Sequence, residues 1–226
     1  MIFQTLDLVA LGFFVVSWIA YAIAVEWLFR DRRGLNAAMD TYREAWMMQA
    51  LAREVRIIDT QIVAALQNGT AFFASTTLLA IGGALTVLRS TDEILSVAGT
   101  LPFGIETTRT QWEAKAFGLA IIFVYAFFKF AWAYRLFNYV AILVGATPPV
   151  EDKDTPAAKA HARRTSLLCE EAGRHFNRGQ RGFFLALGYL GWFVSPYVLI
   201  ASTTAVLIVM WRRQFASKAR QAVLGE

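Results

Sequence analysis

The stretch AFGLAIIFVYAFFKFAWAYRLFNYVAILVGA, Ala116 to Ala146, decides the fold of this chain. It is 31 residues long and holds only two charged side chains, Lys129 and Arg135. A helix needs roughly 20 mainly apolar residues to cross the hydrocarbon core of a bilayer. The stretch therefore predicts a membrane-spanning helix that is longer than that core is thick.

Three other apolar stretches are long enough to cross a bilayer: Leu8 to Phe29, Gly69 to Leu88 and Gly182 to Trp211. The chain is 57% hydrophobic and 14% aromatic, which would leave a soluble protein of 226 residues with too little polar surface. These features predict an all-α, polytopic membrane protein, with four transmembrane helices in one domain over residues 1–226.

The distribution of Lys and Arg predicts the orientation, since basic residues collect on the cytoplasmic side. The first and third connections, 30–68 and 147–181, together carry thirteen: Arg30, Arg32, Arg33, Arg43, Arg53, Arg56, Lys153, Lys159, Arg163, Arg164, Arg174, Arg178 and Arg181. We therefore predict a bacterial inner (plasma) membrane protein with these connections in the cytoplasm and both termini outside. The basic tail argues against this placement of the C-terminus; it contains Arg212, Arg213, Lys218 and Arg220.

Both cytoplasmic connections have the pattern of amphipathic helices, over about 36–68 and 155–181. In the first, apolar residues such as Trp46 and Leu51 recur three or four positions apart, with charged residues between them. Asn36 is a candidate N-cap, and no proline separates this helix from the second span. The spacing thus predicts that two spans continue into the cytoplasm, with helices lying flat on the membrane surface as the alternative.

Polar residues inside the spans are the strongest functional signal, because burying them in hydrocarbon is costly unless they are paired or face a cavity. Lys129, Arg135 and Asn138 belong to one stripe on the third span, and Glu26 lies near the cytoplasmic end of the first. This pattern predicts a polar network in which Glu26 pairs with Lys129 or Arg135. An ion pair that fixes helix register, a path for a substrate or ion, and a proton relay are all open interpretations.

Small residues on the second span indicate where another helix packs closely or where a pore is lined. Thr76, Ala80 and Ala84 recur at intervals of four, and Ser75 and Thr77 extend the hydroxyl run. Such hydroxyls either line a path or bond back to their own helix.

Enzyme motifs are not evident in the sequence. His161 and His175 are fourteen residues apart, and Cys169 is the only cysteine. Neither the histidines nor the cysteine has acidic or thiol partners at metal-ligand spacing. Basic residues are not interleaved with aromatics as in a nucleic-acid site. We expect no enzyme activity, no cofactor, no metal and no nucleic-acid partner.

Three sets of phrases carry a family resemblance: Phe72 to Leu79 with Ile81 to Gly83; Phe128 to Trp132 with Arg135 to Tyr139, Gly145 and Ala146; and Phe176 to Arg181 with Trp192, Phe193 and Pro196. With them the chain resembles a domain-of-unknown-function family of small four-span membrane proteins found in bacteria and plants. The resemblance implies a four-helix membrane fold and transfers no reaction.

Two hypotheses of function remain. In the first, the protein is a structural, accessory or scaffold component that contacts the lipid bilayer and binds itself or other membrane proteins through helix association. In the second, it is a small channel or transporter, and an anion passes along the polar stripe of the third span.

Overall fold

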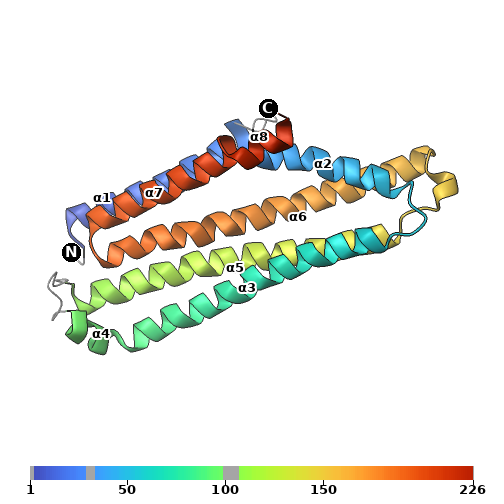
Figure 1. Cartoon of the computed structure of the whole chain (residues 1–226). Coiled ribbons are helices and arrows are strands. Elements are labelled where there is room, and N and C mark those ends of the chain that lie inside the picture. The colour runs from blue at the N-terminus through green and yellow to red at the C-terminus, as the bar shows by residue number, and fades with distance from the viewer. Residues whose placement is uncertain (1–2, 29–33, 99–106, 226) are drawn as a thin grey trace.

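The computed structural model describes residues 3–28, 34–98 and 107–225, all of them helical or in connections between helices (Figure 1). The α-helices are α1 (Thr5–Ile23), α2 (Leu35–Ala50), α3 (Ile57–Arg89), α4 (Thr91–Ala98), α5 (Arg109–Gly145), α6 (Pro156–Tyr189), α7 (Pro196–Phe215) and α8 (Lys218–Leu224). Shorter turns are the π-helix η1 (Ala24–Leu28) and the 3-10 helices η2 (Val150–Asp152) and η3 (Leu190–Phe193).

The predicted fold class is confirmed, with one change in where the spans lie. Four helices are long and apolar enough to cross a membrane: Thr5–Trp27, Ile57–Arg89, Arg109–Gly145 and Pro196–Leu224. The first three match the predicted stretches, and the fourth begins fourteen residues later than predicted. The chain is therefore a multi-pass membrane protein by the length and composition of its helices.

The centre of the molecule is an antiparallel arrangement of the three longest helices, α3, α5 and α6 (Figure 1). Buried residues recur every seven positions on them, which is the spacing of left-handed coiled coils. Most of these residues are small, so the helices approach closely: Val63, Thr70, Thr77 and Ala84 on α3, and Ala158, Thr165, Ala172, Gly179 and Ala186 on α6. At Gly179, an added Cβ would lie 2.8 Å from the Phe130 ring of α5.

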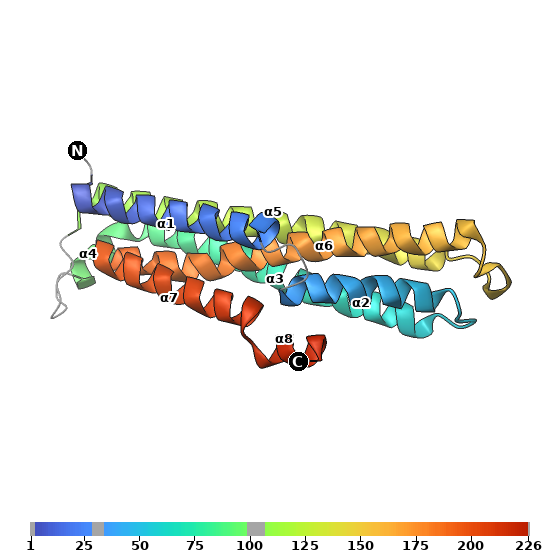
Figure 2. The same cartoon turned by 90° about the horizontal axis from the view of Figure 1, so that it is seen from above.

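Different helices complete the two halves of this central unit (Figures 1 and 2). We call the part covered by α1 and α7 the α1 half, and the part covered by α2 the α2 half. Each half has its own hydrophobic core, built around Phe14, Leu185 and Leu199 in the α1 half and around Met47, Val140 and Val144 in the α2 half.

The predicted fourth span, Gly182 to Trp211, is wrong because the chain reverses inside it. Helix α6 ends at Tyr189, η3 makes the turn, and α7 returns from Pro196 with Ser195 as its N-cap. The turn is tight: a Cβ on Gly191 would lie 2.7 Å from the carbonyl oxygen of Val198. The stretch therefore forms an antiparallel helical hairpin, and the end of α6 is a further helical segment in the α1 half beside the four candidate spans.

This hairpin also places the termini, because α1 and α7 then run in the same direction. Near their starts, Trp192 Nε1 donates a hydrogen bond to Asp7 at 2.8 Å, and near their ends the rings of Tyr21 and Trp211 are 6.4 Å apart. The chain thus begins at the far end of the α1 half and ends beside α2, where Tyr42 donates to the Val223 carbonyl oxygen at 3.2 Å. The prediction that both termini share one side does not agree with this arrangement.

The predicted continuous helix from about 36 into the second span is also wrong. Helix α2 ends at Ala50 and α3 begins at Ile57, and the two run antiparallel (Figure 2). The reversal contains neither Gly nor Pro. It is held by the fully buried carboxylate of Asp59, which accepts hydrogen bonds from Trp46 Nε1 at 2.7 Å and from Arg53, while Arg56 donates to the carbonyl oxygen of Pro148 at 2.6 Å.

Two details of the helix starts complete the comparison. Gly34, rather than Asn36, is the N-cap residue of α2. Helix α6 begins at Pro156 with the side chain of Thr155 accepting from the Ala158 amide, and it continues to Tyr189, eight residues beyond the predicted segment 155–181. Of the thirteen basic residues used for orientation, Arg30, Arg32 and Arg33 lie outside the described residues.

Candidate functional site

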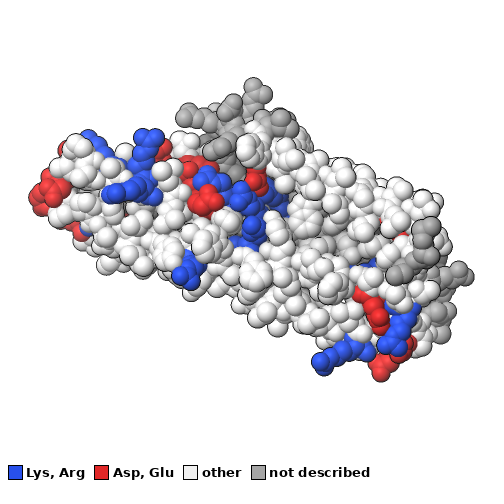
Figure 3. All heavy atoms as spheres, turned by 180° about the vertical axis from the view of Figure 1, so that it is seen from behind, with Lys and Arg blue, Asp and Glu red and all other residues white. Residues whose placement is uncertain are grey.

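A cluster of charged residues lies where the two halves meet (Figure 3). Its centre is Glu26, which belongs to the π-helical turn η1 at the end of α1. The Glu26 carboxylate accepts hydrogen bonds from Arg178 Nε at 3.0 Å and Arg178 Nη2 at 2.7 Å, and also from Arg181. Single π-helical turns within α-helices are frequent at functional sites. This charged triad of η1 and α6 is the candidate site.

The predicted partners of Glu26, Lys129 or Arg135, are wrong. The residues that replace them come from α6, because the hairpin brings the end of α6 into the α1 half next to α1. Arg178 and Arg181 are among the thirteen basic residues that were used to predict the orientation of the chain. Their i, i+3 spacing places both guanidinium groups on one face of α6, toward the same carboxylate.

The three polar residues of the α5 stripe have separate local partners. The Lys129 ammonium lies 5.4 Å from the centre of the Tyr125 ring, and exposed Arg135 donates to the Tyr139 hydroxyl at 2.8 Å. Asn138 accepts from Gln67 of α3 at 2.6 Å. The stripe therefore does not converge with Glu26 on one site.

The hydroxyl run on α3 divides between an inner and an outer face. Thr77 and Ala84 are buried toward α5 and Ala80 is half-buried, whereas Ser75 lies on the exposed side. Thr76 donates to the Phe72 carbonyl oxygen at 2.8 Å and Thr77 to that of Phe73 at 2.9 Å, so both bond back to their own helix.

A second polar cluster at the far end of the α1 half was not predicted. Besides the contact of Asp7 with Trp192, the Lys115 ammonium donates to the Trp192 carbonyl oxygen at 2.9 Å, and all three residues are buried. From Asp7 to Glu26, α1 rises about 29 Å at 1.5 Å per residue, close to the roughly 30 Å of a hydrocarbon core. The two polar clusters are thus about one hydrocarbon core apart, and Figure 3 shows largely uncharged surface between the charged groups at mid-length and at that end.

Two neighbouring cavities adjoin the triad and share Arg181 in their lining. The larger, of about 480 Å³, lies between η1, α2 and α6 and is lined by residues of both signs, among them Glu26, Asp40, Glu171, Arg174 and Arg178. The smaller, of about 240 Å³, lies between the ends of α1 and α7 and the start of α2; its described lining includes Arg181 and Arg213 and no acidic residue.

Glu170 and Glu171 line the larger cavity, and their pKa values shift in opposite directions. Burial raises the pKa of Glu170 above its ordinary value. For Glu171, burial alone would raise the pKa, but the hydrogen bond from Arg174 at 2.7 Å and its positive charge bring the pKa below its ordinary value. Glu171 is therefore ionised near neutral pH, and its charge acts on Arg174 and, more weakly, on Arg178 of the triad.

Cys169 lies on the same helix and is fully buried. Burial raises the pKa of its thiol to about 11, which keeps the sulfur protonated and unreactive at neutral pH. Within the described ranges, no group of three or more His, Cys, Asp and Glu side chains is arranged to hold a metal ion.

Comparison with known proteins gives one match. The model of a family described as "Protein of unknown function, DUF599" matches residues 9–219, which is most of the chain. No curated protein and no solved structure matches.

Proposed function

The chain belongs to the DUF599 family of proteins of unknown function, and we propose that it is a structural or accessory component of the bacterial inner membrane that associates with a second copy through α3. The observation that carries this proposal is the outward face of α3. One side of α3 packs on α5 along the length of the helix, and the opposite side contacts no other described helix closely. This outward face includes Ile57, Ile58, Gln61, Ala65, Asn68, Gly69, Phe72, Ser75, Thr76, Leu79, Gly82, Gly83 and Thr86.

In the α1 half, this face combines small residues with large exposed apolar ones. Gly82 and Gly83 are exposed, and a Cβ added to either would meet no atom within 4 Å. Phe72 and Leu79 beside them are 66% and 77% exposed. Small residues let two membrane helices approach closely, so that the large neighbours pack around the contact.

In the α2 half, the same face carries two large apolar side chains at its tip, beyond the reach of lipid, with Gln61 and Asn68 between them and the α1 half. With the triad at one edge of the hydrocarbon core, the part of α6 before Arg178 projects roughly 30 Å beyond it at 1.5 Å per residue. Ile57 and Ile58 lie at the far tip and are 62% and 63% exposed. Apolar side chains grouped on a surface that faces water mark a protein contact.

A second copy fits this face better than an unrelated partner does. The partner must present an apolar surface inside the bilayer and apolar side chains again roughly 30 Å beyond it, and another α3 has this form by construction. Two copies inserted in the same direction are related by a twofold axis along the membrane normal, so the α3 helices pair in parallel and each residue faces its own counterpart.

Transport of an anion along the α5 stripe has less support. Lys129, Arg135 and Asn138 have separate local partners, and Thr76 and Thr77 bond back to α3. A conducting path needs such groups to face one shared space. Flux of anions through liposomes that contain the protein would favour this alternative.

We expect Gly83→Ile to shift the protein from dimer to monomer, because the branched side chain holds the two α3 backbones apart. Gly12→Ile is the matched control, since Gly12 is also an exposed helical glycine with no atom within 4 Å of an added Cβ. The measurement is the oligomeric state in lipid nanodiscs by native mass spectrometry. A monomeric unmodified chain, or equal effects of the two substitutions, would contradict self-association through α3.

A further inference from the structure

The smaller cavity at the triad is lined as an anion site would be. Arg181 and Arg213 supply positive charge, and Asn177, Gln180 and Gln214 supply amide groups from α6 and α7. Its described lining contains no Asp or Glu. Guanidinium and amide N–H groups are the donors that bind phosphate oxygens.

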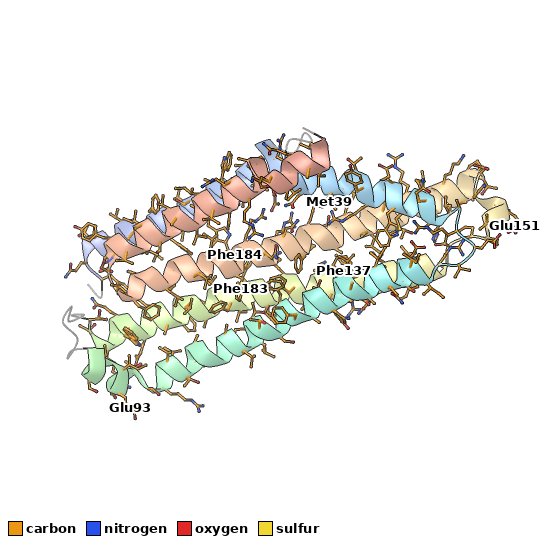
Figure 4. All side chains as sticks on the ribbon, viewed as in Figure 1. Met39, Glu93, Phe137, Glu151, Phe183 and Phe184 are labelled. Carbon is orange, nitrogen blue, oxygen red and sulfur yellow. The ribbon has the colours of Figure 1, made fainter. Side chains whose placement is uncertain are left out.

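The described lining of the smaller cavity carries unbalanced positive charge. Arg178 and Arg181 share the single carboxylate of Glu26. The Arg213 guanidinium lies 5.6 Å from the centre of the Phe184 ring, and no ion pair is formed between it and a carboxylate in the described ranges. Figure 4 shows Phe184 on the side of α6 toward α7, opposite Phe183, which packs on α5. Within the described residues, Arg213 is therefore the guanidinium group of the smaller cavity that is left for an anionic ligand to neutralise.

An apolar groove of about 320 Å³ meets this cavity at Tyr21, which lines both spaces. The groove lies between α1 and α7 in the α1 half and is lined almost entirely by apolar surface: Phe13, Tyr21, Thr204, Leu207, Ile208, Trp211 and Arg212. Figure 2 shows α1 and α7 diverging along this half. The groove therefore runs from the charged boundary into the part of the protein that matches the hydrocarbon core.

Because the anion cavity and the apolar groove lie side by side at Tyr21, we propose that the protein holds one anionic phospholipid of the leaflet at the triad. Its phosphate lies between Arg181 and Arg213, and one acyl chain lies in the groove between α1 and α7. A free phosphate ion would use the same guanidinium groups but would leave the groove without an occupant. The apolar groove favours a lipid over a free ion, and the arginines of the adjacent cavity favour an anionic lipid.

The test compares three probes on the delipidated full-length protein in detergent: phosphatidylglycerol, phosphatidylcholine and inorganic phosphate. We expect one phosphatidylglycerol to bind with at least about fivefold higher affinity than phosphatidylcholine, as one interfacial arginine contributes about 1 kcal/mol. The measurement is the lipid-bound fraction by native mass spectrometry. We expect inorganic phosphate at the same concentration to give no comparable protection in a thermal-unfolding assay.

Arg213→Gln should abolish the preference for phosphatidylglycerol, and Arg213→Lys should retain part of it. Arg135→Gln is the control, because Arg135 is also an exposed arginine but belongs to α5 and does not line the cavity. Leu207→Trp, which fills the groove and leaves the charges intact, should weaken binding of both lipids. Equal affinity for the two lipids, equal effects of Arg213→Gln and Arg135→Gln, or equal protection by inorganic phosphate would overturn the proposal.

Discussion

Glu26→Gln is expected to lower the free energy of unfolding by roughly 1.5–3 kcal/mol, the range for a lost hydrogen bond to a charged group. The substitution keeps the shape of the side chain but removes the charge that both Arg178 and Arg181 contact. The Arg181 side chain is only 12% exposed, so water replaces the lost carboxylate poorly. Denaturant unfolding in detergent, followed by circular dichroism, measures the change.

A double-mutant cycle separates the two possible partners of Glu26. Glu26→Gln combined with Arg181→Met should destabilise the protein less than the sum of the two single changes, because each change alone leaves a charge without its partner. Glu26→Gln combined with Lys129→Met should be additive, since Lys129 contacts the Tyr125 ring instead. Coupling of Glu26 with Lys129, and none with Arg181, would contradict the triad.

Asp59→Ala is expected to have the largest effect of a single substitution, with a loss of about 3 kcal/mol. Asp59 is fully buried at the reversal between α2 and α3, and its removal leaves the Trp46 indole N–H and the Arg53 guanidinium without their acceptor. The same unfolding experiment measures the loss.

Asp154→Ala is the control for that substitution. Asp154 contacts Lys159 at 3.7 Å, but its side chain is 82% exposed, and an exposed ion pair contributes little. Equal effects at positions 59 and 154 would show that the reversal does not depend on the buried carboxylate.

The sequence predicted the spans best where a helix is apolar along its whole length. Ala116–Ala146 lies within α5 apart from its last residue, and Leu8–Phe29 matches α1 and η1. The prediction of one span over Gly182–Trp211 was wrong because hydrophobicity indicates which residues are buried, and it does not indicate where the chain reverses direction. The apolar residues of the end of α6, the turn η3 and α7 form one uninterrupted run, within which Ser195 and Pro196 begin a new helix.

The reversal between α2 and α3 left no local signal in the sequence. Its residues, Leu51 to Arg56, include no Gly, Pro or Asn, and the apolar spacing continues through them. The contacts of Asp59 with Trp46 and of Arg56 with Pro148 help to fix the turn, and such contacts are not visible in helical periodicity.

Only part of the candidate site was predicted, again because contacts between distant residues are not visible in the sequence. Glu26 was identified because a carboxylate in a span needs a partner. The choice of partner depended on which helix lies beside α1, which no pattern within a single helix determines. The i, i+3 spacing of Arg178 and Arg181, facing one way at the start of an apolar run, was the available signal.

The hairpin of α6 and α7 also changes how the basic tail is explained. With the chain reversing at η3, Arg212, Arg213, Lys218 and Arg220 lie on the same side as α2 and the start of α6. The opposite end then holds Arg89, Arg109 and Lys115 alone among the described Lys and Arg residues. The tail thus agrees with the positive-inside rule, and we propose that the α2 half and the C-terminus are cytoplasmic.

The central claim is that the chain reverses direction within Gly182–Trp211, and a pair of topology reporters tests it most directly. One reporter is inserted near Lys153, in the connection between α5 and α6, and the other is fused after Glu226. The hairpin predicts that both reporters are active on the cytoplasmic side. A cytoplasmic signal at Lys153 with an extracytoplasmic signal at Glu226 would mean that Gly182–Trp211 crosses the membrane once, and would contradict the account.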